Sequence, residues 1–117
     1  MREDPQRFLP LSTATLHILL ALAGEDRHGY AIMQEVGRQT AGKYKLSPGT
    51  LYDNLQKLMD QGVVEDRGQK ADDDDPRRRY YRLSALGRGV LTAEIDRLER
   101  LIREGRGFLR ASKPRRA

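Results

Sequence analysis

The chain has 117 residues, 38% of them hydrophobic and 33% charged, and its 22 Lys and Arg against 17 Asp and Glu leave a net charge of +5. This length fits one domain, because single hydrophobic cores typically span about 100–150 residues. The chain has no cysteine, which excludes disulfides, thiolate metal sites and cysteine nucleophiles. The longest apolar run, residues 18–23, is six residues long, far short of the roughly 18 that a membrane span needs.

The basic charge is unevenly distributed. The first 60 residues carry seven of the 22 bases and seven of the 17 acids, so the whole excess lies in residues 61–117. Such an asymmetry favours a polyanionic partner, nucleic acid before a membrane surface. Acidic residues follow Met1 closely and lead into no apolar segment of the signal-peptide type, so we expect a cytoplasmic protein with no membrane association.

Two helices are predicted in the first part of the chain. Ser12 or Thr13 can cap the first, because a hydroxyl accepts an orphan backbone N–H, and Gly24 ends it. Its apolar residues have the i, i+3, i+4, i+7 spacing of one helix face: Leu16, Leu19, Leu20 and Ala23. A polar loop is expected at 25–28. The second helix then begins at 29–30, places Tyr30, Ile32, Met33 and Val36 on its apolar side, and ends within 37–42.

The third helix has the clearest start. Ser47 is an N-cap type, and Pro48 follows at the first helical position, where its missing N–H costs nothing. Apolar residues then recur at i, i+4, i+7 and i+8, and Gly62 ends the helix; they are Leu51, Leu55, Leu58 and Met59. On the opposite side lie polar types that can bond base edges or phosphates, among them Thr50, Asn54 and Lys57.

The last third of the chain predicts a β-hairpin and one more helix. Residues 63–65 and 79–83 are short β-branched or aromatic runs, separated by a long charged loop. Ser84 can cap the final helix, and Gly105 and Gly107 are expected to fray its end. This helix carries a heptad seam that calls for one packing partner, formed by Leu91, Ile95, Leu98 and Ile102.

Three helices followed by a hairpin and a helix is the order of a winged helix-turn-helix domain. We therefore predict a mainly α fold with a β-hairpin, divided into an N-terminal extension (1–10), a winged helix-turn-helix domain (11–83), a C-terminal dimerisation helix (84–109) and a disordered basic tail (110–117). In this fold the third helix enters the major groove, while the hairpin wing touches the neighbouring backbone. Lys43 and Lys45, just before the third helix, would then lie near phosphates.

Three segments resemble one family. Ser47–Gly62 is similar to the recognition helix of PadR-type transcriptional regulators, His28–Ile32 to the opening of their second helix, and Arg77–Gly87 to their wing strand and the start of the last helix. The resemblance covers about residues 11–104. With its single C-terminal helix, the chain is similar to the compact branch of the family. This resemblance implies a homodimeric DNA-binding repressor, in which the seam residues pair the two subunits, released by a small aromatic or cationic ligand.

From these arguments we predict a double-stranded, pseudo-palindromic operator as partner. The predicted DNA contacts are Lys43, Lys45, Ser47, Thr50, Tyr52, Asn54, Lys57, Arg77, Arg78 and Arg79. Some assignments remain open at this stage. Tyr52 fits the core or a phosphate contact equally well. The three arginines either touch the DNA backbone or neutralise the acidic run Asp72–Asp75, which is itself either a solvated loop or an arginine partner.

Few residues of the sequence suggest a ligand pocket. The chain has no tryptophan, so the aromatic walls of a ligand pocket would be Phe or Tyr, and Phe8 and Phe108 are the candidates. The alternative function is a winged-helix module that binds a protein through the same surface, without specific DNA readout.

No pattern in the sequence points to catalysis or to a bound metal. His17 and His28 are eleven residues apart without thiols, which matches no zinc spacing, so structural or surface roles are expected. The acidic run lacks the glycine and final glutamate of a calcium loop. Phosphate-cradling loops and nucleophile motifs are also missing, so we expect no enzyme and no cofactor.

Overall fold

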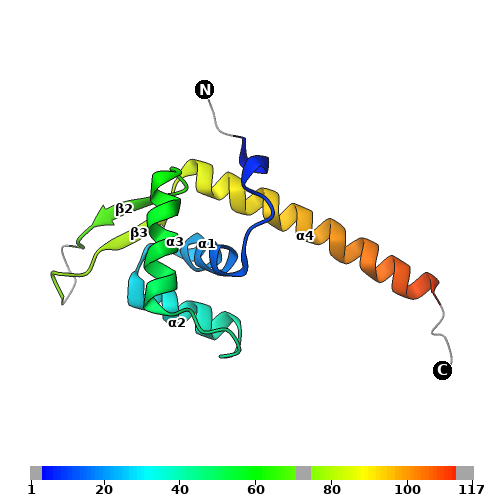
Figure 1. Ribbon diagram of the computed structural model, residues 1–117, viewed down its shortest axis with the longest axis horizontal. Helices are drawn as coiled ribbons and strands as arrows, with labels where there is room; N and C mark the ends of the chain where they lie inside the picture. Colours follow the sequence, from blue (N-terminus) through cyan, green and yellow to red (C-terminus); the bar gives the residue numbers. More distant parts are fainter. Residues whose placement is uncertain (1–3, 71–74, 113–117) are drawn as a thin grey trace.

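The computed structural model describes residues 4–70 and 75–112 (Figure 1). A short 3-10 helix, Pro5–Phe8, precedes α1 (Thr13–Gly24), β1 (Arg27–His28), α2 (Gly29–Gln39), α3 (Pro48–Asp60), β2 (Val64–Gly68), β3 (Tyr80–Leu83) and α4 (Ala85–Ala111). Four side chains cap the α-helices by accepting a backbone N–H three residues on: Ser12, His28, Ser47 and Ser84. The predicted winged helix-turn-helix with one long C-terminal helix is confirmed.

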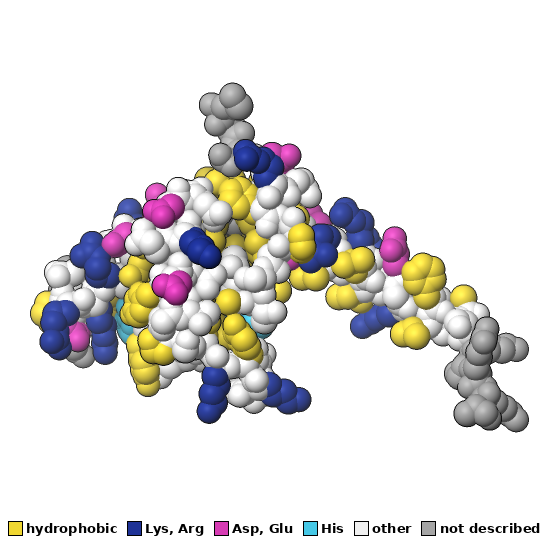
Figure 2. Space-filling view, in the orientation of Figure 1, with side chains coloured by type: hydrophobic (Ala, Val, Ile, Leu, Met, Phe, Trp, Pro, Cys, Tyr) yellow, Lys and Arg dark blue, Asp and Glu magenta, His cyan; other side chains and the backbone are white. Residues whose placement is uncertain are grey.

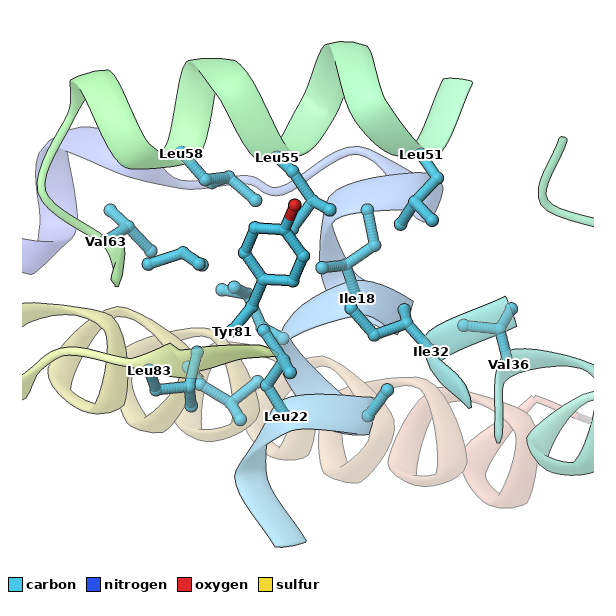
Figure 3. Close-up of a cluster of buried hydrophobic side chains, with 14 of the residues drawn as sticks. Ile18, Leu22, Ile32, Val36, Leu51, Leu55, Leu58, Val63, Tyr81 and Leu83 are labelled. Carbon is cyan, nitrogen blue, oxygen red and sulfur yellow. The ribbon is translucent and has the colours of Figure 1, made fainter. Parts of the chain in front are cut away.

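The core lies between α1, α3 and the sheet (Figure 3). Leu51, Leu55 and Leu58 project from the inner side of α3, as predicted, and Tyr81 of β3 points up toward them. The predicted face of α1 is only partly correct: Leu19 is buried, whereas Leu16, Leu20 and Ala23 are half-buried. Because α1 contacts α2, α3, α4 and β3, residues on its other sides are buried as well, namely Ile18, Ala21 and Leu22.

The wing is a three-stranded sheet of order β1-β3-β2 instead of a two-stranded hairpin. The segment expected as a polar loop contains β1, in which Arg27 pairs with Tyr81 and His28 with Tyr80. On the other side β2 pairs antiparallel with β3, with an irregular register between Asp66 and Gly68. Two residues carry no readable strand pattern, so only the pairing with β3 makes this segment a strand.

The distal part of α4 projects from the body of the molecule (Figure 1). The radius of gyration is accordingly 17.2 Å, against about 13 Å for a compact domain of 100 residues. The helix continues through Gly105 and Gly107 to Ala111 and does not fray at these glycines. Residues 113–117 of the predicted basic tail lie outside the described residues. Among the described helices, none combines the length and the apolar character that crossing a bilayer requires.

The N-terminal extension packs on the first half of α4. The Glu94 carboxylate, 1% exposed, accepts a hydrogen bond from the Leu11 backbone N–H at 2.9 Å. Arg97 donates to the same carboxylate through two nitrogens, and this hydrogen bonding lowers the pKa of Glu94 while burial opposes the shift. The hydrogen bond from Leu11 thus ties the end of the extension to α4, and Arg97 pairs with the carboxylate that accepts it.

Candidate nucleic-acid interface

Helix α3 turns its leucines inward and its polar residues outward. Its first turn is held by Ser47, whose hydroxyl accepts from the Thr50 backbone N–H at 3.2 Å and donates to the Thr50 hydroxyl at 3.0 Å. Lys57 is exposed, as predicted. Asn54 is half-buried and already engaged: its amide oxygen accepts from the Thr15 hydroxyl at 3.0 Å, and its amide nitrogen donates to the Thr50 carbonyl at 2.8 Å. Asn54 therefore joins α3 to α1, in addition to any contact with bases.

Tyr52 leaves the leucine face and leans toward the start of α2. A Cβ built on Gly29 would overlap the Tyr52 hydroxyl and lie 3.0 Å from its ring carbon Cζ, so glycine at this position makes room for the tyrosine. Tyr52 is 50% exposed, which excludes the core alternative. Tyr30, expected on the apolar side of α2, is 60% exposed beside it. Two tyrosines thus stand at the surface where α2 begins and α3 passes.

The wing arginines are held by acidic side chains. The Asp66 carboxylate of β2 accepts from Arg79 Nε at 2.9 Å and from the Gly68 backbone N–H at 2.7 Å. The hydrogen bond from Arg79 holds the pKa of Asp66 below its usual value, against a smaller effect of burial. Arg77 bonds Asp75 through its backbone N–H at 2.9 Å and its Nε at 3.3 Å, and these contacts lower the pKa of Asp75.

The wing arginines were expected either to touch the DNA backbone or to neutralise the acidic run. Arg77 does pair with the one described member of the acidic run, Asp75, whereas Arg79 pairs with the opposite strand. Asp72–Asp74 lie outside the described residues. Both guanidinium groups keep exposed surface, 90% of the side chain for Arg77 and 56% for Arg79. Pairing with an acid and facing solvent are therefore compatible for both.

A hollow of about 370 Å³ separates the wing from α2 and α3. It is lined by Gly29, Tyr30 and Tyr52 on the helical side and by His28, Asp75, Arg77, Arg78, Arg79 and Tyr81 on the wing side. Figure 2 shows Lys and Arg side chains gathered over the wing, at the left of the view. Arginine and tyrosine are residue types that bond phosphate oxygens, so this hollow suits a polyanion backbone.

The turn between α2 and α3 presents two more cations. Tyr44 is half-buried and stacks on His17 with ring centroids 5.6 Å apart, which anchors the middle of the turn. Lys43 and Lys45 on either side of it are exposed. The Lys43 backbone N–H donates to the Thr40 carbonyl, but among the described residues neither lysine side chain has a hydrogen bond or an ion pair, so both ammonium groups are available to phosphates.

The two predicted ligand residues are not brought together within the chain. Phe8 lines a separate hollow of about 330 Å³ between the N-terminal extension, α1, α3 and α4. Phe108 lies near the far end of α4 and is 70% exposed. The histidines have structural roles, as expected: His28 Nδ1 accepts from the Ala31 N–H at 3.2 Å, and His17 bonds Gln39 at 3.1 Å. No group of metal-binding side chains occurs within 4–70 and 75–112.

The predicted dimer seam divides into two parts. Leu91 is 5% exposed and belongs to the core of its own chain, so it is wrong as a contact to a partner. Ile95, Leu98 and Ile102 lie farther along α4, where Ile95 and Ile102 are 39% and 51% exposed. Leu101, Phe108 and Leu109 add to this apolar surface with exposures of 51%, 70% and 79%. These six side chains from Ile95 to Leu109 form one apolar stripe. At about 100° per residue it spans about 140° of the helix circumference, which is wider than a heptad seam.

Comparison with known proteins identifies the family. Residues 18–93, more than half of the chain, match the Transcriptional regulator PadR-like family. The chain belongs to this family. It is 38% identical over 89 residues to the transcriptional regulator Rv3488 of Mycobacterium tuberculosis, covering 76% of this chain and 78% of that protein. It is 34% identical over 65 residues to the transcriptional regulator YqjI of Escherichia coli, covering 56% of this chain and 31% of that longer protein.

Solved PadR-type structures share the fold. A PadR family regulator from Clostridium difficile superposes with a TM-score of 0.71 at 20% identity, over 84% of this chain and 99% of that chain. Bacillus subtilis PadR, solved in complex with operator DNA, superposes with a TM-score of 0.62 at 21% identity, over 74% of this chain and 48% of that one. Membership of the PadR-like family assigns this protein to transcription regulation and not to catalysis.

Sequence reasoning missed several residues of this surface. Asp66 has no motif that marks it as the partner of Arg79, because the two residues lie 13 positions apart. Gly29 and Tyr30 do belong to a segment that resembles the family, so a signal was present. Their positions beside Tyr52 follow only from the packing of α2 on α3.

Proposed function

We propose that this protein is a homodimeric, cytoplasmic repressor that binds a pseudo-palindromic operator through α3, the α2–α3 turn and the wing. The observation that carries the proposal is the set of exposed cations and tyrosines on the elements that flank α3. Lys43 and Lys45 flank one end of α3, and the arginine-lined hollow flanks its side. The complex of Bacillus subtilis PadR with operator DNA is consistent with this assignment.

In the proposed complex the two kinds of contact have different tasks. The exposed side of α3 enters the major groove and reads base edges, while the lysines of the turn and the arginines of the wing hold phosphates. Two copies of α3 would occupy successive major grooves about 34–36 Å apart. The carboxylates that pair with Arg77 and Arg79 keep the guanidinium groups ordered. When DNA binds, phosphate oxygens would compete with these carboxylates for the same guanidinium N–H groups.

The apolar stripe of α4 supports the dimer. A chain of this size exposes large apolar side chains over a projecting helix, which is costly in water and is relieved by a second copy. A stripe of about 140° suits contact with more than one helix of the partner. Dimerisation would also place two recognition surfaces in a fixed relation, as a palindromic operator requires.

We propose that a small aromatic or cationic molecule at this dimer interface releases the operator. Phe108 supports the assignment, because it is a large exposed aromatic side chain within the stripe. A ligand between the two α4 helices would alter the separation of the two α3 helices.

DNA binding measured against salt concentration tests the proposed function. We expect log affinity for operator-containing DNA to fall linearly with log salt, by about 0.9 per neutralised phosphate. Replacing both Lys43 and Lys45 by alanine removes four phosphate contacts from the dimeric complex and should reduce that slope by about 4. The control is Arg100→Ala, which removes one cation from the side of α4 opposite the stripe and should leave the slope unchanged.

Fragments selected from genomic DNA supply the operator for this experiment. Failure to retain any fragment at low salt, or a slope unaffected by the double lysine variant, would contradict DNA recognition through this surface. Failure to retain any fragment would instead favour the alternative module that binds a protein.

A further inference from the structure

The outward side of α3 contains few polar groups that are not already used within the chain. The Ser47 and Thr50 hydroxyls bond each other at 3.0 Å, and the Asn54 amide bonds Thr15 and Thr50. The Gln56 amide donates to the Asp60 carboxylate at 3.0 Å. Asp53 and Lys57 are exposed, and within the part of the chain that the structure describes their side chains form no hydrogen bond and no ion pair.

Asp53 lies at the centre of this outward side. At about 100° per residue it is about 140–160° from each of the buried residues Leu51, Leu55 and Leu58. Lys57 follows one turn later, about 6 Å along the axis and 40° around it. Gly49 lies one turn before Asp53, and a Cβ there would meet nothing within 4 Å. Since the Asp60 carboxylate on the same side is held by Gln56, this side of α3 presents one unengaged described carboxylate, that of Asp53, with an ammonium group beside it.

A carboxylate at this place is unfavourable against most of the DNA surface, because phosphates repel it. It gains only from donors on base edges, and in the major groove these are the amino groups of cytosine N4 and adenine N6. Aspartate typically accepts from cytosine N4, whereas lysine donates to guanine O6 and N7. A C·G pair offers that donor and those acceptors side by side in the groove.

We propose that Asp53 is a specificity-determining residue that requires a cytosine in each half-site, with Lys57 donating to a guanine of the same or the neighbouring pair. This inference rests on the proposed function, because it assumes that α3 enters the major groove. It assigns a selective role to a negative charge that nonspecific attraction to DNA would disfavour. Asp53 thereby penalises sites that lack the cytosine amino group.

The test compares base preferences of the purified full-length protein and its Asp53→Ala and Asp53→Asn variants. Each protein is equilibrated with a set of duplexes that carry every single-base substitution of the selected operator. For the wild type we expect one position per half-site at which replacing cytosine weakens binding about 10- to 100-fold. The alanine variant should lose that preference only, and should bind nonspecific DNA at least as tightly as the wild type. The asparagine variant should shift the preference toward adenine, whose N6 and N7 it can bond.

Asp60→Ala is the matched control, because it removes the same charge from the last residue of the same helix. It should leave every base preference unchanged. Operator binding in which the Asp53→Ala variant keeps all wild-type preferences would overturn the inference and leave the proposed function standing. Absence of any sequence preference in the wild type would overturn both. Matching thermal melting curves establish that the variants are folded.

Discussion

Gly87 lies in the first turn of α4 and packs against Val63, and replacing it by alanine should destabilise the protein. A Cβ on Gly87 would overlap the Val63 carbonyl oxygen and lie 3.2 Å from the carbonyl carbon and 3.4 Å from Leu83 Cδ2. The carbonyl is backbone and is held in place, because it accepts from the Ser84 N–H and from the Ser84 hydroxyl, each at 3.1 Å. The overlap therefore cannot be relieved by rotating a side chain.

The expected loss can be worked out from three contributions. Overpacking of this kind costs about 1–3 kcal/mol. Loss of a hydrogen bond to the displaced carbonyl adds about 1 kcal/mol, and the better helix propensity of alanine returns at most about 1 kcal/mol. The free energy of unfolding should therefore fall by about 2 kcal/mol, which corresponds to a Tm lower by roughly 8 °C for a chain of this size.

Thermal and urea denaturation followed by circular dichroism measure this change, with all proteins at one concentration because a dimer unfolds in a concentration-dependent way. Gly107→Ala is the matched control. It lies in the same helix, on the side opposite the apolar stripe, and its Cβ would meet nothing within 4 Å. The free energy of unfolding of that variant should rise by about 0.5–1 kcal/mol, because alanine favours a helix over glycine. Equal stability of the two variants would refute the close approach of α4 to Val63.

Three further predictions concern the dimer, the DNA surface and the buried carboxylate. Ile102→Asp should place a charge in the proposed interface and weaken dimerisation at least about 100-fold, measured by sedimentation equilibrium. Gly29→Ala should displace the Tyr52 side chain, which swings more easily than backbone, and so lower operator affinity about 5-fold with little loss of stability. Glu94→Gln should lower the free energy of unfolding at pH 7 by about 2 kcal/mol through loss of the charged pair with Arg97. Because folding lowers the pKa of Glu94, its contribution is present above the unfolded value of about 4.3 and disappears as pH falls through the folded value, so wild type and variant should converge in acid.

Each of these predictions has its own control. Arg100→Asp changes the charge of α4 on the side away from the stripe, and it should remain dimeric; a dimer in both variants would dismiss the stripe as the interface. Gly29→Ala should have no effect on affinity in a Tyr52→Ala background, and an undiminished effect there would contradict the steric argument. A constant difference in stability between pH 7 and pH 3 would show that Glu94 is not the group that titrates.

Local patterns sufficed for the helices and for the exposure of the lysines in and before α3. Ser47 and Pro48 start α3 because capping and proline geometry act between neighbouring residues, and the leucine spacing orients the helix without reference to the rest of the chain. The same reasoning applies to the exposure of Lys43, Lys45 and Lys57. These residues depend on short-range rules, so the printed order of amino acids was enough to predict them.

Other features depend on which segments meet in space. The pairing of β1 with β3, the bond from Thr15 to Asn54 and the carboxylate of Glu94 beneath the N-terminal extension join residues that are 39 or more positions apart, and no local pattern announces them. Leu91 has the heptad spacing of the dimer seam, but the fold buries it against its own chain. The net charge of +5 indicated a polyanionic partner, whereas the availability of Asp53 and Lys57 became clear only once tertiary contacts had engaged the polar groups around them.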